Sequence, residues 1–204
     1  TRLYTDRAID YLKNRRTADK PFLLYVSHTM MHEVIGASAN FKGKSAGSLY
    51  GDVVEEFDHE TGRLLDVLDQ LELRENTLVI YTSDNGPWNQ TAYTSRQTRH
   101  PKGTIFWGEA GPLRNGKGSC YEAGARVPCI IRWPGKVPAG SVSDAIFATI
   151  DFMPTFATLA GFAVPDDRRI DGVDQTELLF GKHPQGARDS FYYVHAMRQG
   201  KWKY

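Results

Sequence analysis

The amino-acid sequence predicts an α/β fold with a largely parallel central sheet. Short, strongly apolar segments of strand length alternate along the chain with segments of helical periodicity, an order typical of strands joined by crossover helices. Polar segments follow the first strand-like segments, as expected at the carboxyl ends of parallel strands. With 204 residues, the chain is long enough for one domain, or for one domain and a small appendage.

The charge balance and the apolar runs argue against two classes of protein. The 25 Lys and Arg residues are matched by 24 Asp and Glu residues, so the formal net charge is +1. Such a chain has no basic surplus with which to wrap a polyanion, and a dedicated nucleic-acid binder is disfavoured. No apolar run approaches the ~20 residues that a membrane-spanning helix needs, so we expect no membrane span.

The first half of the chain predicts two helices and two strands. An amphipathic helix begins at the capping pair Thr5-Asp6 and runs to about Arg16. The apolar segment 22–26 predicts a fully buried strand. The strongest helical period spans 49–71, with acidic residues on the opposite face. The apolar segment 78–81 predicts a second buried strand.

The second half begins with long polar segments and then returns to regular patterns. Residues 87–110 are polar and aromatic with little periodicity, which is typical of a long functional loop or lid. Residues 111–126 are rich in glycine. The remaining expected elements are a strand at 127–133, helices at 152–159 and 176–179, and a strand at 191–194.

Both ends of the sequence suggest a piece of a longer protein. The chain opens on a helical pattern without an initiator Met or a leader, and it stops within a strand-like pattern at Trp202-Lys203-Tyr204. The two cysteines, Cys120 and Cys129, are too few for a disulfide framework and lack the clustered His of a zinc site. Their spacing leaves open whether they pair with each other.

Asp84 and Asn85 follow the second strand and are candidate metal ligands. An adjacent carboxylate and amide on a sharp turn before Gly86 offer two hard oxygen donors, which suit Ca²⁺ or Mg²⁺. The alternative is an Asx turn that only ends the strand, because Asp-Asn-Gly is ordinary turn chemistry. Both interpretations remain open at the level of the residues.

Two histidines and one lysine are further candidates for chemistry. His28 and His32 follow the first strand, where a reacting group would be reached, although loop histidines are as often ordinary surface residues. Lys117 stands between Gly116 and Gly118, so a close backbone could approach an anion that the ammonium neutralises. The segment lacks the spacing of a P-loop, and a flexible surface turn is the alternative.

Taken together, these residues indicate displacement at a tetrahedral oxyanion centre, phosphate or sulfate. A hard-cation pair, a His and a Gly-flanked Lys follow successive strands of one predicted sheet. A two-zinc phosphatase would place His near Asp, but the residue after Asp84 is Asn85 and no His-x-x-x-His cluster accompanies it. One hard cation therefore fits better than two zinc ions.

At this point the chain resembles a known family, the formylglycine-dependent sulfatases, and within it the branch of arylsulfatase A and N-acetylgalactosamine-6-sulfatase. The resemblance covers nearly the whole chain in the family's order. It rests on the segments Tyr50–Asp58, Asn76–Pro87, Gly111–Gly118, Tyr121–Pro128, Arg132–Gly135, Asp151–Thr155 and Asp171–Val173.

The resemblance implies an alkaline-phosphatase-like α/β/α sandwich and hydrolysis of aryl or carbohydrate sulfate esters. It implies one Ca²⁺ ion, with Mg²⁺ less favoured, held in part by Asp84 and Asn85. By the same motifs, Lys117 is the lysine that contacts sulfate, and His32 is the active-site histidine that binds sulfate or protonates the departing alcohol. The formylglycine nucleophile arises in a C/S-x-P-S-R motif, which this chain lacks and which the family carries upstream.

The family's order also predicts the division of the chain. Residues 1–165 are expected to form the C-terminal part of the catalytic α/β domain, and residues 166–204 the beginning of a smaller C-terminal subdomain. The chain would then need its own N-terminal half, and we expect the isolated 204 residues to be inactive. The family suggests a periplasmic, secreted or lysosomal location, whereas the sequence does not define the oligomeric state.

Two other functions remain open beside the sulfatase. One is a hydrolase of the same superfamily that acts on phosphate or phosphonate esters. The other is a non-catalytic binding module that keeps the fold. Within 87–110, Trp88, Tyr93, His100 and Trp107 are candidates for contact with a sugar or aryl group or for the loop's own packing. Asn89-Gln90-Thr91 matches the glycosylation acceptor pattern.

Overall fold

The computed structural model describes residues 1–15, 20–88, 108–193 and 195–204. These residues form two compact units, each of which contains two separate stretches of the chain. Unit 1 comprises 1–77 and 85–126, and unit 2 comprises 78–84 and 127–204. The domain boundary expected between residues 165 and 166 stays a prediction.

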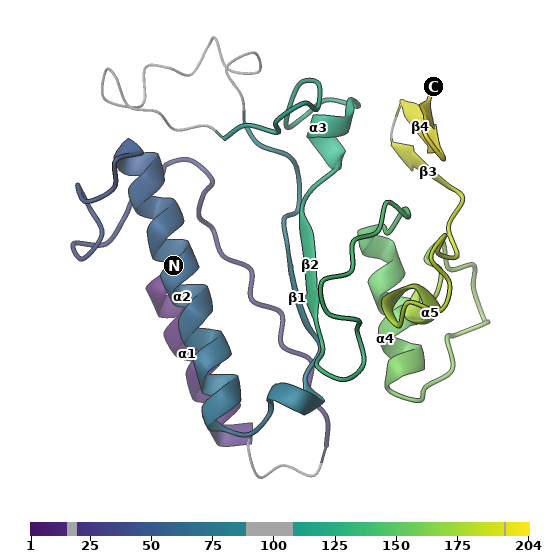
Figure 1. Ribbon diagram of the computed structural model, residues 1–204, viewed down its shortest axis with the longest axis horizontal. Helices are drawn as coiled ribbons and strands as arrows, with labels where there is room; N and C mark the ends of the chain where they lie inside the picture. The colour runs from purple at the N-terminus through teal and green to yellow at the C-terminus, as the bar shows by residue number, and fades with distance from the viewer. Residues whose placement is uncertain (16–19, 89–107, 194) are drawn as a thin grey trace. The chain divides into compact units, whose positions relative to one another are not determined.

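Two long helices build unit 1. Helix α1 (Arg2–Arg15) lies along helix α2 (Ser48–Gln70), as Figure 1 shows. The buried residues of α1, Thr5, Ala8, Ile9 and Leu12, recur at helical spacing and so share one face. Both predicted helices are present, because an apolar stripe is encoded locally in the sequence, but the first begins at Arg2, before the expected cap at Thr5-Asp6, and residue 16 lies outside the described residues. After α2 the chain makes a short 3-10 turn, η1 (Arg74–Asn76).

Buried carboxylates on α2 fix the loop that precedes this helix. The carboxylate of Asp52 accepts hydrogen bonds from the backbone N–H groups of Gly43, Lys44 and Ser45, at 2.7, 3.0 and 2.8 Å. One turn later, Glu56 accepts a hydrogen bond from the N–H of Ser38 at 2.7 Å. The backbone hydrogen bonds hold the pKa of Asp52 below its usual value. Loop and helix therefore form one structured element.

The segment 22–26 differs from the expected buried strand. The structure assigns no strand to residues 20–29, and none of the strand pairings among the described residues includes them. Side-chain exposure alternates along the segment, and Leu23 and Tyr25 are 73% and 85% exposed. An apolar run becomes a buried strand only where partner strands flank it, which its own sequence cannot encode.

Unit 2 contains a two-stranded sheet. Strand β1 (Val79–Thr82) pairs with strand β2 (Cys129–Arg132) in antiparallel register, with Ile80 opposite Ile131. Both strands were predicted, but the largely parallel pairing is not seen in the described residues, where every paired strand is antiparallel. The order of strands and helices along a sequence indicates the fold class, whereas strand direction depends on how the connecting chain returns.

A buried polar cluster organises the helices of unit 2. The short turn η4 (Thr149–Asp151) leads into α4 (Phe152–Leu159), which packs against α5 (Thr176–Leu179). Asp151 is fully buried and accepts hydrogen bonds from the N–H groups of Ala148 and Val173 and from the guanidinium of Arg188. Both predicted helices are confirmed with the expected bounds.

The described chain ends in a three-stranded antiparallel meander. Its strands are β3 (Ser190–Tyr193), β4 (Ala196–Gln199) and β5 (Trp202–Lys203), in that order. The predicted strand at 191–194 corresponds to β3, although residue 194 lies outside the described residues. Among the helices that the structure describes, none is long and apolar enough to cross a membrane.

Candidate active site

Within unit 1, the segment Asn85–Trp88 is hydrogen-bonded to the glycine-rich segment. Asp84 ends the first stretch of unit 2, and Asn85 begins the second stretch of unit 1. The N–H of Gly86 donates to the carbonyl of Gly124 at 3.1 Å, and the N–H of Lys117 donates to the carbonyl of Pro87 at 2.8 Å. These backbone hydrogen bonds hold Asn85–Trp88 against the segment that carries Lys117.

Gly86 is required at this turn because the neighbouring backbone is too close for a side chain. A Cβ atom at this position would lie 1.6 Å from the carbonyl oxygen of Ala123, far inside van der Waals contact. Ala123 lies in the short helix α3 (Glu122–Ala125), whose residues Ala123 and Gly124 are buried. The sequence Asp-Asn-Gly is therefore fixed by a close approach as well as by turn chemistry.

The glycine-rich segment folds tightly around Lys117. Asn115 and Gly118 both adopt positive φ angles, of 68° and 83°, which reverse the backbone on either side of the lysine. The N–H of Ala123 donates to the carbonyl of Arg114 at 3.2 Å and closes the loop. The Arg114 guanidinium also lies over the ring of Tyr121, 4.0 Å from its centroid. Two positive-φ turns, a backbone hydrogen bond and a cation–π contact therefore define the conformation of this segment.

Trp88 brings two of the predicted site residues together. The ammonium of Lys117 lies 5.2 Å from the centroid of the Trp88 ring. The imidazole of His32 meets the same indole in an edge-to-face arrangement, with ring centroids 6.2 Å apart and an interplanar angle of 70°. His32 and Lys117, which are distant in sequence, are thus neighbours around one aromatic side chain, and all three residues belong to unit 1.

The hydrogen bonding of His32 engages one of its two ring nitrogens. Nδ1 lies 2.8 Å from the carbonyl oxygen of Glu33, and a carbonyl only accepts hydrogen bonds. Nδ1 therefore carries a proton in this contact, and Nε2 is the ring nitrogen that the contact leaves available. The His32 side chain is exposed.

A small apolar core supports these residues. Ile35 and Val53 are buried, and Met31 and Trp88 are among the partly buried residues that pack against them. Ile35 lies three residues after His32, while Val53 lies in the second turn of α2. The helix therefore provides the base on which the segments of His32 and Trp88 rest.

Asp84 and Asn85 carry oxygen atoms of the type that binds a hard cation, but the two residues supply only part of a coordination shell. Their carboxylate and amide oxygens are ligands that Ca²⁺ prefers, and Ca²⁺ takes six to eight oxygen atoms. The Asn85 amide nitrogen donates to the carbonyl of Gly86 at 2.9 Å, which orients the side chain at the turn. Within the described residues, no group of three or more His, Cys, Asp or Glu side chains is placed to hold a metal ion.

Comparison with known proteins identifies the family. The family model described as Sulfatase matches residues 1–162 of this chain. The chain belongs to the sulfatase family. The N-acetylgalactosamine-6-sulfatase of Canis lupus familiaris is 38% identical over 193 residues, which are 95% of this chain and 35% of that protein. The steryl-sulfatase of Homo sapiens is 39% identical over 183 residues, 89% of this chain and 30% of that protein.

A solved structure confirms the fold class. The PsFucS1 sulfatase from Pseudoalteromonas sp. matches 98% of this chain with a TM-score of 0.85 and 29% sequence identity, and this chain covers 39% of it. The sulfatase chain therefore has the alkaline-phosphatase-like α/β fold, of which it represents a part. It spans about a third of the length of the curated relatives named above, 35% and 30%.

His28 is not part of the same cluster in this sulfatase chain. Its ring lies edge to face with Phe57 of α2 and with Tyr4 of α1, at centroid distances of 5.0 and 5.8 Å. Burial lowers the pKa of His28, whereas the carboxylate of Glu60 acts in the opposite direction. His28 therefore packs between the two helices, which differs from both the reactive residue and the surface residue that the sequence suggested.

The two cysteines do not pair with each other. Cys120 and Cys129 are both free thiols.

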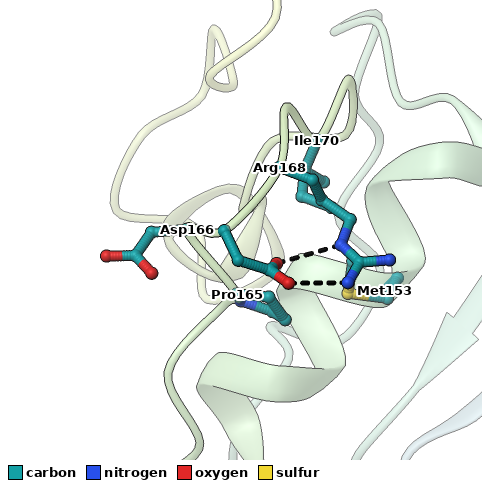
Figure 2. A pocket seen from close by; sticks show the side chains of 6 residues that line it. Met153, Pro165, Asp166, Arg168 and Ile170 are labelled. Carbon is teal, nitrogen blue, oxygen red and sulfur yellow. Dashed lines mark hydrogen bonds and ion pairs between the residues drawn. The ribbon is translucent and has the colours of Figure 1, made fainter.

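A hollow of about 440 Å³ lies in unit 2, lined by Met153, Pro165, Asp166, Asp167, Arg168 and Ile170 (Figure 2). Arg168 pairs with Asp167 inside it at 2.9 and 2.6 Å, and the lining includes no predicted site residue. Asn89-Gln90-Thr91, Tyr93, His100 and Trp107 lie outside the described residues.

Sequence reasoning missed the joint contact of Trp88 with His32 and Lys117. The sequence named Trp88 only as a loop aromatic, for ligand contact or for packing. Its position directly after Asp84-Asn85-Gly86-Pro87 is a signal that could have distinguished it from the aromatics further along the loop. A side chain that directly follows a strand-end turn is held near the site by that turn.

Proposed function

We propose that the protein containing this chain hydrolyses sulfate esters and that this chain supplies the residues on the sulfate-binding and leaving-group side of the active site. The observation that carries the proposal is the convergence of His32 and Lys117 on Trp88 in a member of the sulfatase family. A cation and a titratable imidazole held together are suited to a substrate with a charged sulfate and a departing oxygen.

Lys117 neutralises negative charge in this proposal. A sulfate ester carries one negative charge before reaction, and cleavage of the S–O bond places further charge on the departing oxygen. An ammonium held in position by its neighbours stabilises that developing charge without costly reorganisation. The tight turns at Asn115 and Gly118 fix the backbone of Lys117 for this role.

His32 protonates the leaving group. In this role the ring enters the reaction as the imidazolium, with Nδ1–H held by the Glu33 carbonyl and a second proton on Nε2. As the S–O bond breaks, the Nε2 proton passes to the oxygen of the departing alcohol, and the proton released when water replaces that oxygen on sulfur returns to Nε2. The proposed substrates are aryl or carbohydrate sulfates.

Asp84 and Asn85 would hold one Ca²⁺ ion, together with ligands from outside this chain. When bound, the cation polarises the sulfate oxygens, and a formylglycine outside this chain supplies the nucleophile. The isolated 204 residues are accordingly proposed to be inactive.

The test compares sulfate and phosphate esters of one fluorescent alcohol. The full-length protein and the isolated chain 1–204 are assayed with 4-methylumbelliferyl sulfate and 4-methylumbelliferyl phosphate in the presence of Ca²⁺. The proposal expects sulfate turnover by the full-length protein and none by the isolated chain. Faster hydrolysis of the phosphate would instead support a phosphate ester hydrolase, and no hydrolysis of either ester would support a binding module.

A further inference from the structure

We propose that Trp88 is a positioning residue that holds the Lys117 ammonium and the His32 imidazole in their working geometry. This inference rests on the proposed sulfatase function. Trp88 contacts both groups through a single indole ring, and the ring itself is fixed by the core beneath it.

Lys117 is held at both ends by two consecutive residues. Its backbone N–H donates to the Pro87 carbonyl at 2.8 Å, and its ammonium lies 5.2 Å from the centroid of the Trp88 ring. A free lysine side chain samples many rotamers, and ordering it costs conformational entropy. The cation–π contact offsets part of that cost before substrate arrives, so the ammonium is already in position to meet the sulfate.

His32 is fixed by two contacts of different kinds. The hydrogen bond from Nδ1 to the Glu33 carbonyl sets which nitrogen is protonated, and the contact with the Trp88 ring limits rotation of the imidazole. Together they determine the direction of Nε2. Loss of the indole would leave the tautomer unchanged but would free the ring to rotate.

The indole has a rigid base of its own. Trp88 is half-buried and packs against the core of Ile35 and Val53, which are 4% and 1% exposed. Because Val53 lies on the long helix α2, the ring is anchored to the most regular element of unit 1. The contact geometry therefore follows from the fold and does not depend on a bound ligand.

The test uses Trp88→Leu and Trp88→Phe in the full-length protein, alone and combined with Lys117→Met. Trp133→Leu is the matched control, because Trp133 is also half-buried and lies beside an aromatic ring, that of Phe180, with ring centroids 6.2 Å apart. We expect Trp88→Leu to lower kcat/KM for an aryl sulfate about tenfold and Trp88→Phe less than about threefold. Trp133→Leu should leave kcat/KM of the folded protein unchanged.

The double variant separates positioning from general stability. In the Lys117→Met background, Trp88→Leu should lower kcat/KM by a smaller factor than in the wild-type background, because only His32 is then left for the indole to position. An equal loss in both backgrounds would overturn the positioning of Lys117 by Trp88. A loss in Trp88→Phe as large as in Trp88→Leu would overturn it as well.

A second measurement does not depend on activity. In full-length protein labelled at the histidine rings, Trp88→Leu should shift the nuclear magnetic resonance signal of the His32 Cε1–H and leave that of the exposed His183 in place. An unshifted His32 signal would overturn the contact itself. If wild-type protein hydrolysed no sulfate ester while this shift occurred, the proposed function would fail and the positioning of His32 by Trp88 would stand.

Discussion

The imidazole of His32 and the indole of Trp88 lie edge to face, with ring centroids 6.2 Å apart, on a core built from α2 and the segment after residue 30. The Lys117 ammonium lies over the ring of the same indole in a cation–π contact. One aromatic side chain thus connects three segments that are remote in sequence. The predictions below follow from this arrangement and from the elements that support it.

Substitution of His32 should affect poor leaving groups most. In the full-length protein, His32→Gln should lower kcat for a sugar or alkyl sulfate about 10²-fold or more, because such an alkoxide departs only when protonated. For 4-nitrophenyl sulfate, whose phenolate departs unaided, the loss should be about tenfold or less. The ratio of kcat values for the two substrates measures this difference. Equal losses would show that His32 does not act as an acid.

Chelation should abolish activity, and Ca²⁺ should restore it better than Mg²⁺. Asp84→Asn removes a charged oxygen ligand, so the full-length variant should need at least about tenfold more Ca²⁺ for half-maximal activity. A Ca²⁺ titration of aryl sulfate hydrolysis measures this requirement. Asp58→Asn, which alters an exposed aspartate of α2, is the control and should leave it unchanged. Identical titration curves for Asp84→Asn and wild type would remove Asp84 from the cation site.

Gly86→Ala should disrupt the turn that carries the site. The added Cβ would lie 1.6 Å from the Ala123 carbonyl oxygen, so the backbone must move, at a cost of about 3 kcal/mol or more in the free energy of unfolding. Gly62→Ala is the matched control. Gly62 lies within α2 with no atom within 4 Å of its added Cβ, and alanine there should stabilise the helix by about 1 kcal/mol. Denaturant unfolding measures both changes, and a neutral Gly86→Ala would contradict the close approach.

The buried pair of Asp151 and Arg188 should control the stability of unit 2. Arg188→Met would leave a buried carboxylate without its guanidinium partner, and we expect a loss of about 3–5 kcal/mol in the free energy of unfolding near pH 7. Arg168→Met, which removes an exposed partner of Asp167, is the control and should change little. Denaturant unfolding of the full-length protein distinguishes the two variants.

The same pair predicts a pH dependence. Burial alone would raise the pKa of Asp151, but hydrogen bonds from Arg188, Val173 and Ala148 outweigh burial and lower it below 3.8. At Asp151 the native state therefore binds fewer protons than the unfolded state. The contribution of this carboxylate to the free energy of unfolding is present above pH 4 and is lost as the pH falls further. In Arg188→Met the carboxyl can protonate when buried, so the difference between variant and wild type should shrink from pH 6 to pH 3. A constant difference would contradict this.

The helices were predictable because their signals are local. The period of apolar residues over 49–71 gave α2 to within one residue at each end, and α4 and α5 matched as well. The prediction of a buried strand at 22–26 was wrong, because the burial of these side chains depends on partner strands elsewhere in the chain. The antiparallel pairing of β1 with β2 was missed for the same kind of reason, since strand direction is set by non-local connections.

The sequence names candidate site residues, whose roles stay predictions, but it does not specify their arrangement. His32, Lys117 and Asn85 could be named from motif context, and the structure holds them in one compact unit. The contact that unites His32 with Lys117 is made by Trp88, and no sequence spacing specifies it. Asp52 likewise gave no sign that its carboxylate binds three consecutive backbone N–H groups. Such relationships arise from tertiary packing.

The most direct measurement is the hydrolysis of an aryl sulfate by the full-length protein and by its Lys117→Ala variant. With Ca²⁺ present, we predict turnover by the wild-type protein and a value of kcat lower by about 10²–10³-fold in the variant, because a positioned charge is lost from the transition state. An intact fold in the variant, checked by circular dichroism, completes the comparison. Undiminished turnover by Lys117→Ala would contradict the claim that this chain supplies the sulfate-binding side of the active site.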